Sequence, residues 1–465
     1  MGEALMRSVN RCFGVSALAL LVLTAACTEP NSPVLGSPQV RFGKAPPTSG
    51  PTVTAALPSS APQDITLDVQ ISGSGFVSGS NAQWLRGGLP DDRVRTNSTR
   101  FVSSSSLVAN ITISLDAVPT LYDIAVTTPA GKKGIGTEAF AVLSMQRLPA
   151  PDDISRANDV NSTGVIVGNR GGGCDSHVLP VIWEGDGSIA DLPLPAGFCN
   201  GAALLINNAQ VVVGLAGPTP YKVPVRWVPG PTGYAAEIMG SFPDTAVLEI
   251  HGLNDAGHVV GDLFEGSRSS PLWWSDATGF VTLKLAVGST GCYATDIDEA
   301  DEIVGSCYIG GIAAAVFWSS SEAVPIILPR MPGYDSHHSA QALNDYGVAT
   351  GYGWTHGRAN KIVRTAVRWV RNGSSWSVES IATLGGGNPI PSSINNAGWI
   401  TGSDYATGTA MHAFLWRPGQ GITDLGSIGL ESYGWSINNP PAGSQTLIVG
   451  MTDVKSIFRA VVWRP

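Results

Sequence analysis

The pattern of apolar and polar positions repeats seven times in the C-terminal two-thirds of the chain. Each copy has an apolar residue, then Asn (in one copy Asp), a short turn, and an apolar run that ends in Gly. The Asn or Asp positions are Asn161, Asn207, Asn254, Asp298, Asn344, Asn395 and Asn438. The steps between them are 46, 47, 44, 46, 51 and 43 residues. Self-similarity at such a period indicates a repeat fold in which each copy is one structural unit.

Two further landmarks recur in every copy. One is a short apolar run that ends in Trp, at Trp183, Trp227, Trp274, Trp318, Trp369, Trp416 and Trp463. The other is a Leu or Ile strand, clearest at Ile422–Gly426. The landmarks together predict four short strands in each copy, which is the size of a β-propeller blade. We expect the Trp side chains to fill the space between blades, because they have a large area to bury.

The two ends of the repeat array have complementary strands. Residues 145–149 form a single predicted strand before the first copy, and the last copy stops after the strand 459–464. Pairing the two would close the array and leave no long open edge. The sequence therefore predicts an all-β chain in which residues 145–465 form a seven-bladed propeller closed in this way. An open β-solenoid is the alternative, and it would not need complementary ends.

The repeated Asn has an explanation in turn chemistry. In Leu253–Gly257, the Asn side chain can bond the backbone two residues on, and the Gly can adopt a positive φ. Gln210 and Asp301 stand in place of that Gly in copies two and four, so we expect those turns to be strained or differently shaped. Turn formation accounts for all seven positions, and no ligand role is assigned to them.

Residues 51–143 differ from the repeats. Short alternating runs such as Ile65–Ile71 are separated by Gly and Ser turns, which predicts a β-sandwich. The phrase Ile71–Phe76 and the closing Gly136–Val142 resemble the immunoglobulin-like IPT/TIG domain. The resemblance implies a spacer or adhesion module without catalysis.

The repeats resemble the HAF repeat family of bacterial extracellular proteins. The resemblance is carried by Met411–Trp416, Asp424–Gly429 and Ser436–Asn439, and also by Ala382–Gly387 and Ser392–Gly398. Other copies keep the Asn and Trp landmarks and lose the His-Ala-Phe letters. The resemblance implies an extracellular repeat protein and carries no assigned chemistry.

The N-terminal segment has the features of an export signal. Arg7 and Arg11 precede the apolar stretch Phe13–Ala26, which is too short to span a membrane. Its end at Cys27 resembles the lipobox of bacterial lipoproteins, although Thr24 departs from the preferred Leu. We expect a signal peptide over residues 1–26, a lipid on Cys27 that binds the membrane, and a flexible linker over 27–50. Location in the outer membrane or at the cell surface follows, and ordinary secretory cleavage is the alternative.

The remaining cysteines fit an oxidising compartment. Cys174, Cys199, Cys292 and Cys307 are even in number, so we expect them to pair. Four cysteines allow three connectivities, and sequence proximity favours 174 with 199 and 292 with 307. No CxxC spacing supports a zinc site.

Charge and motifs exclude several classes of function. The formal net charge is −9, and no Lys/Arg cluster that would favour nucleic acid is present. Signatures of nucleophilic, nucleotide-binding and zinc enzymes are missing. Asp186, Asp298, Glu299 and Asp301 lack the fixed spacing of a calcium loop. We therefore expect no cofactor, no metal and no catalytic residue, and we expect a monomer.

The densest polar cluster lies in the fifth copy. Aromatic side chains with polar neighbours suit the recognition of sugars or peptides, and Asp beside His can also bind metal or transfer protons. The candidate ligand-binding residues are Asp335, His337, His338, Tyr352, Trp354 and His356. A solvated loop with chance histidines explains the same residues.

Three functions stay open on the sequence. The preferred one is a non-enzymatic binding or display scaffold in the bacterial cell envelope, with a glycan or a protein as partner. The second is a propeller hydrolase or lyase acting on extracellular polysaccharide, which needs two carboxylates in one pocket. The third is a structural envelope component without a discrete ligand.

Overall fold

The structure is a computed structural model. It describes residues 50–465 except 64, 115, 152–153, 172–177, 186, 218–222, 244, 334–336, 357–361, 407–409 and 455–456. Every regular element in this part of the chain is a strand, in agreement with the predicted all-β class. No helix in the described ranges could cross a lipid bilayer. The predicted signal peptide, Cys27 and the linker lie outside the described residues.

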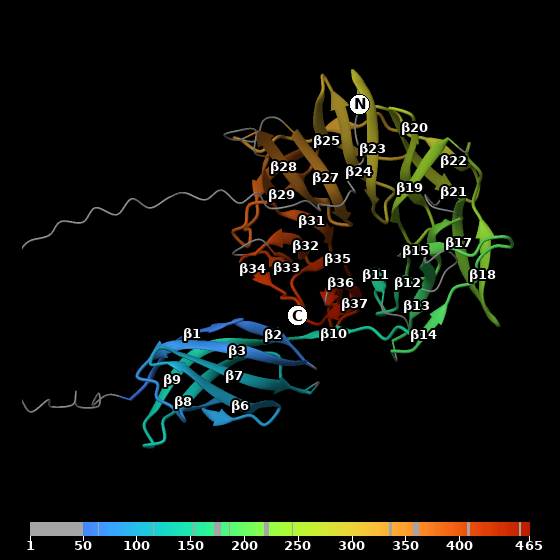
Figure 1. Cartoon of the computed structure of the whole chain (residues 1–465). Helices are drawn as coiled ribbons and strands as arrows, with labels where there is room; N and C mark the ends of the chain where they lie inside the picture. The colour runs from blue at the N-terminus through green and yellow to red at the C-terminus, as the bar shows by residue number, and fades with distance from the viewer. Residues whose placement is uncertain are drawn as a thin grey trace, which may run out of the picture. The chain divides into compact units, whose positions relative to one another are not determined.

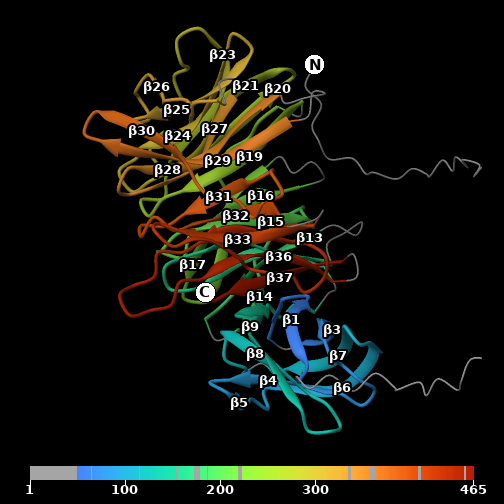
Figure 2. The same cartoon turned by 90° about the vertical axis from the view of Figure 1, so that its left-hand side faces the viewer.

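Residues 52–143 form two sheets around one core, coloured blue to cyan in Figures 1 and 2. The core takes side chains from both sheets, including Ile71, Trp84, Tyr122 and Phe140. One sheet has the order β1 (Thr52–Leu57), β3 (Ile65–Ser74), β7 (Ser106–Ile113) and β6 (Val94–Ser103). The other has the order β2 (Ser60–Pro62), β9 (Lys133–Leu143), β8 (Leu121–Thr127), β4 (Asn81–Arg86) and β5 (Leu89–Pro90).

The repeats fold into four-stranded antiparallel sheets, each built from consecutive strands and consistent with a propeller blade. The first three such sheets contain β11 (Ser155–Val160), β12 (Ile166–Gly171), β13 (Val178–Trp183) and β14 (Ile189–Asp191); β15 (Gly201–Ile206), β16 (Val212–Ala216), β17 (Val223–Gly230) and β18 (Gly233–Ile238); and β19 (Ala246–Leu253), β20 (Val259–Glu265), β21 (Arg268–Ser275) and β22 (Gly279–Thr282). The next three contain β23 (Ser289–Ile297), β24 (Ile303–Ile309), β25 (Ile312–Trp318) and β26 (Ile326–Ile327); β27 (His337–Asn344), β28 (Val348–His356), β29 (Ile362–Asn372) and β30 (Ser375–Ser380); and β31 (Ile390–Ile394), β32 (Ile400–Tyr405), β33 (Met411–Arg417) and β34 (Gly421–Asp424).

The last sheet of the array joins its two ends. Its order is β10 (Met145–Arg147), β37 (Ile457–Trp463), β36 (Ile448–Val454) and β35 (Ser432–Ile437). β10 pairs antiparallel with β37, with Met145 opposite Trp463 and Arg147 opposite Val461. The strand predicted from residues 145–149 therefore lies against the strand predicted from 459–464.

The first strand of each repeat lies nearest the middle of the array, as Figure 1 shows for β15, β19, β27, β31 and β35. Each of these first strands has a β-bulge shortly before its Asn or Asp. The register shifts are at Ala157/Asp159, Ala203/Leu205, Ile250/Gly252, Ala294/Asp296, Ala340/Ala342, Pro391/Ser393 and Gly434/Ser436. A bulge adds one residue to a strand and redirects the side chains beside it.

The landmark Trp side chains are buried between neighbouring sheets. Trp227, for example, packs with Val167 and Ile182 of the preceding sheet, and Trp183 packs with Val449 and Val462 of the sheet that contains β10. Most of the indole N–H groups also bond a carbonyl of the segment that links the two sheets. These bonds run from Trp183 to Pro149, Trp227 to Pro193, Trp274 to Met239, Trp318 to Lys284, Trp369 to Pro329 and Trp463 to Leu425.

The repeated Asn side chains link the sheets as well as forming turns. In six copies the Oδ1 atom accepts a backbone N–H four residues on, as in Asn344 with Val348 at 2.9 Å. In the seventh copy the turn is longer, and Asn438 Oδ1 accepts the N–H of Leu447. The Nδ2 atom donates to the carbonyl of the next Asn or Asp. We call these bonds the inner series: Asn161 to Asn207, Asn207 to Asn254, Asn254 to Asp298, Asn344 to Asn395, Asn395 to Asn438, and Asn438 back to Asn161.

The two turns without Gly keep the backbone conformation of the others. Gln210 has a φ of 60° and Asp301 a φ of 61°, close to the 71° of Gly347 in the fifth copy. The left-handed region is unfavourable for residues with a side chain. The expected strain is therefore present, and the turn shape is unchanged.

One predicted disulfide is present among the described residues. Cys292 of β23 and Cys307 of β24 are directly opposite in the sheet and joined, with a Cα–Cα distance of 4.0 Å. Cys199 is also disulfide-bonded, and its expected partner, Cys174, lies outside the described residues.

Candidate functional site

A cavity of about 230 Å³ opens at the end of the array where the Asn turns lie. It is lined by residues from the first strand of all seven sheets of the array. Because the bulges redirect the strands there, both residues of pairs such as Asn158 and Asp159 or Thr295 and Asp296 face the cavity. The lining is mostly polar and contains four carboxylates, Asp159, Asp255, Asp296 and Glu299.

Asp159 and Asp296 hold the bulged strands to their neighbours. Asp159 accepts the N–H of Val160 and of Ile206 in the next sheet, and also the Ser436 hydroxyl at 2.6 Å. Asp296 accepts the N–H of Ile297 and of Leu343 in the next sheet.

Burial makes both carboxyl groups weaker acids than an ordinary Asp side chain. It raises the pKa of Asp159 to about 6, against hydrogen bonds that lower it. It raises the pKa of Asp296 to about 7, with a further contribution from the negative charges of Asp159 and Asp298.

A positive charge faces the cavity from His251. Burial lowers the pKa of His251, but its bonds to Asp262 and Glu249 outweigh burial and raise the pKa to about 9. The imidazole Nε2 lies 3.1 Å from Asp262, whose side chain is buried, and 3.5 Å from Glu249. These two carboxylates therefore fix the imidazolium in place.

Trp435 is the aromatic side chain of the cavity lining. It is 39% exposed, whereas the landmark Trp side chains are buried. An exposed indole beside amide and hydroxyl groups is the combination found in sites for polar ligands with an apolar face. The amides and hydroxyls nearby include Asn158, Thr295, Gln341 and Ser392.

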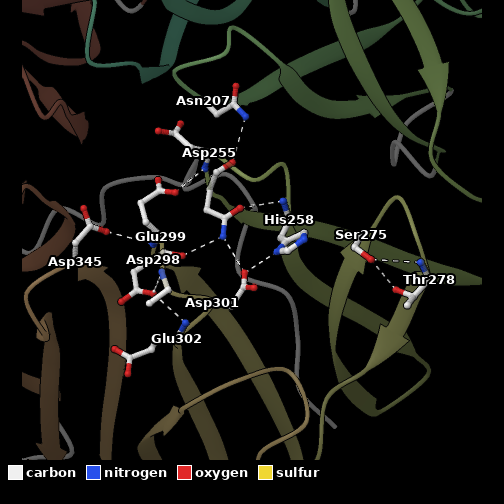
Figure 3. A network of polar contacts seen from close by, with 12 residues as sticks. Asn207, Asp255, His258, Ser275, Thr278, Asp298, Glu299, Asp301, Glu302 and Asp345 are labelled. Carbon is white, nitrogen blue, oxygen red and sulfur yellow. Dashed lines mark hydrogen bonds and ion pairs between the residues drawn. The ribbon is translucent and has the colours of Figure 1, made fainter.

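A second set of hydrogen bonds surrounds the mouth of this cavity. We call it the outer series: in six copies, the residue after the Asn or Asp donates its backbone N–H to the side chain of its counterpart in the next sheet. The bonds join Ser162 to Asn208, Asn208 to Asp255, Asp255 to Glu299, Glu299 to Asp345, Asp345 to Asn396, and Asn396 to Asn439. Three consecutive members are acidic, and Figure 3 shows Asp255, Glu299 and Asp345 side by side.

The three acidic residues of the outer series repel one another. Burial and the charges of Asp255, Asp345 and Asp298 raise the pKa of Glu299 to about 7. The rest of the outer series, from Asn396 through Ser162 to Asn208, is neutral. One side of the mouth is therefore negative and the other offers amides and a hydroxyl.

The cluster predicted from the fifth copy lies at the opposite end of its sheet. His337 stacks on Trp354 with ring centroids 4.5 Å apart, and Tyr352 contacts Trp354 at 5.6 Å. His337 lies in β27, seven residues before Asn344, and Tyr352 and Trp354 lie in β28. Arg364 lies over the Tyr352 ring.

Two members of that cluster take part in the packing of the sheet. His338 is 1% exposed, and its Nε2 accepts the Met331 N–H. His337 Nδ1 accepts the Ala313 N–H. His356 is the last residue of β28, and Asp335 lies outside the described residues.

The repeated Asn residues and Glu299 of the lining were named in the sequence analysis, but the residues before the Asn were not, because no single residue type recurs there in all copies. The position two before the Asn or Asp is, in chain order, Asp, Leu, Gly, Asp, Ala, Ser and Ser. An alignment of the copies would have shown a usable signal, since acidic and hydroxyl residues recur directly before an apolar strand end. Within the described residues, no group of three His, Cys, Asp or Glu side chains could hold a metal ion.

Comparisons with known proteins found no matching family model and no matching curated protein. Similar solved structures include TolB from Acinetobacter baumannii, 13% identical over 64% of this chain and 79% of that chain, with a TM-score of 0.36. An auxiliary nutrient binding protein from Bacteroides ovatus is 12% identical over 90% and 99% of the two chains, with a TM-score of 0.33. A Hadza microbial sialidase is 9% identical over 78% and 77%, with a TM-score of 0.43. Similarities at this level assign neither a ligand nor an activity to this chain.

Proposed function

We propose that residues 145–465 form a seven-bladed HAF-repeat β-propeller that acts as a non-enzymatic binding scaffold in the bacterial cell envelope. Seven four-stranded sheets in the described part of residues 145–465 support this arrangement. So does the pairing of β10 with β37 and the return of the inner series from Asn438 to Asn161. The two-sheet unit of residues 51–143 is proposed as an IPT/TIG-like spacer, and Cys27 as the lipid anchor.

The cavity at the Asn end carries this proposal. It is the point at which all seven sheets contribute side chains to one concave, polar surface. Its volume of about 230 Å³ suits one sugar ring or one amino-acid side chain rather than a large cofactor. A glycan or a protein loop that inserts one residue into the mouth fits this size.

A second candidate function is hydrolysis or elimination on an extracellular polysaccharide. The observation in its favour is that Asp159 and Asp296 line one cavity and have raised pKa values. Against it, each carboxylate already accepts N–H groups of two neighbouring sheets. A group held in this way has little freedom to exchange a proton with a substrate, so binding is the better supported function.

The test compares two Trp variants in one binding assay. The chain from residue 51 onward is incubated with a panel of envelope and extracellular polysaccharides, and retained protein and released product are measured in the same tubes. We expect retention without product for the native protein. Trp435→Ala should weaken retention roughly tenfold or more, because exposed aromatic anchors dominate binding energy.

The matched control is Trp354→Ala, which removes an aromatic ring at the opposite end of its sheet. It should leave retention unchanged. Loss of binding in this variant alone would indicate that the binding site lies at the His337–Trp354 end. Release of product would favour the hydrolase or lyase function. The absence of both retention and product would contradict a glycan-binding role and leave a protein partner or a structural component.

A further inference from the structure

The inner series has one position at which the donor is replaced by an acceptor. Six copies carry Asn, and its Nδ2 donates to the carbonyl of the next copy at 3.0–3.3 Å. The fourth copy carries Asp298, whose expected partner by this pattern is the Asn344 carbonyl. An ionised carboxylate and a carbonyl are both acceptors, and two acceptors form no hydrogen bond.

The geometry of Asp298 is otherwise that of the Asn residues. Its Oδ1 accepts the N–H groups of Ala300 and Glu302, both at 2.9 Å. These match the bonds from Tyr346 and Val348 to Asn344 Oδ1. The remaining atom, Oδ2, therefore occupies the place of the Asn Nδ2.

That Oδ2 atom is buried and has no hydrogen-bond partner in the part of the chain that the structure describes. Asp298 as a whole is only 4% exposed. A buried oxygen without a partner is costly, and a single proton would turn it into a donor.

We propose that Asp298 binds a proton on Oδ2 at mildly acidic pH, and that the resulting Oδ2–H donates to the Asn344 carbonyl. The seventh link of the inner series then exists only while the proton is bound. The link joins the sheet that begins with β23 to the sheet that begins with β27. The strength of this one link therefore depends on pH, whereas the strength of the six Asn links does not.

The charges around Asp298 favour the neutral acid. Burial raises its pKa to about 6, against the two backbone bonds, and the negative charges of Glu302 and Asp345 raise it further. Glu299 and Asp301 lie on the same turn as Asp298, as Figure 3 shows, and Asp296 lies at the end of the strand before it. The neighbouring cation, Arg371 of β29, is paired with Glu302.

The direction of the pH effect follows from linkage. In the unfolded chain the carboxyl titrates near its ordinary pKa of 3.8, and in the folded protein the pKa is about 6. Below pH 3.8 both states carry the proton and the link is fully present. As the pH rises through the window from 3.8 to about 6, the unfolded state ionises first, so the stability contributed by the link is lost.

The decisive experiment compares the thermal midpoints of the native protein and Asp298→Asn from pH 4 to pH 8. We expect the two proteins to have nearly equal midpoints at pH 4. The variant should be more stable at pH 8, because an amide donates at every pH. Glu299→Gln is the matched control, since it removes the adjacent carboxylate of raised pKa without touching the inner series.

Two outcomes would overturn the proposal. One is that the native protein and Asp298→Asn have equal thermal midpoints at pH 8. The other is that Glu299→Gln raises the midpoint at pH 8 as much as Asp298→Asn does, because the gain would then come from reduced charge repulsion in general. Infrared spectroscopy of the native protein at pH 5 gives a second measurement. A carboxylic-acid carbonyl band should be present that Asp298→Asn removes and Glu299→Gln keeps. An identical spectrum for the native protein and Asp298→Asn would also count against it.

Discussion

At the scale of single residues, the indole N–H groups have a function besides filling space. Six of the landmark Trp side chains bond a carbonyl in the segment that leads from one sheet to the next. Trp416 is the exception: no hydrogen bond of its indole N–H is found within the described residues, and the ring packs against Arg368 at 4.9 Å. The linking segments are thus fixed by hydrogen bonds as well as by apolar contact.

This difference predicts unequal effects of two identical substitutions. Trp183→Phe keeps most of the buried ring but leaves the Pro149 carbonyl without its donor. We expect it to cost about 1–3 kcal/mol of unfolding free energy on account of the lost bond, in addition to the loss of ring volume. Trp416→Phe loses ring volume alone and should cost less. Urea denaturation of both variants measures the difference, and equal costs would contradict a stabilising role for the bond.

Residues with a fixed local role could be read from the sequence, and residues without one could not. Asn and Gly recur because the same turn forms in each copy, and Trp recurs because a space of similar volume is filled between each pair of sheets. Asp159, His251 and Trp435 line one cavity but occupy positions where the seven copies differ. These side chains face the cavity because of the β-bulges, and the position of a bulge cannot be recognised from the residue types of a single sequence.

At the scale of strands, the β23–β24 hairpin carries a covalent cross-link. Cys292 and Cys307 are fully buried and directly opposite each other, on strands joined by the turn that carries Asp298 and Asp301. The sequence could predict this pair, because two cysteines on adjacent strands of one copy need only local geometry to meet.

Removing this cross-link should destabilise the protein measurably. The double substitution Cys292→Ala and Cys307→Ala opens a loop of 15 residues, for which the chain-entropy estimate is about 3 kcal/mol. The urea midpoint should fall, and it should no longer respond to a reductant at this hairpin. A native protein and a variant with the same midpoint under oxidising conditions would show that the hairpin is held by its hydrogen bonds alone.

At the scale of the whole array, stability depends on the short strand β10. It covers the edge of β37, and its neighbours Ser144 and Leu148 add backbone bonds to Arg464 and Ala460. The sequence could predict this pairing, since an orphan strand at one end matched a missing strand at the other. An uncovered β37 would offer unpaired backbone groups to another chain.

Gln146→Pro tests this dependence. Proline cannot donate to the pairing with Val462 and is excluded from paired strand positions. We expect a lower thermal midpoint and self-association that grows with concentration, measured by size exclusion with light scattering. Gln146→Ala keeps the backbone donor and should have the same apparent mass as the native protein at every concentration. A Pro variant with the apparent mass of the native protein at high concentration would show that β37 is protected in some other way.

The direction of the β10–β37 pairing has a mechanical consequence. Met145 lies opposite Trp463, so the chain enters and leaves this sheet at the same end. A force pulling residues 144 and 464 apart would therefore load one pair of residues at a time, as in opening a zipper, rather than shearing all pairs together. The contact that shields the array from other strands is thus also the place where stretching would begin to unravel it.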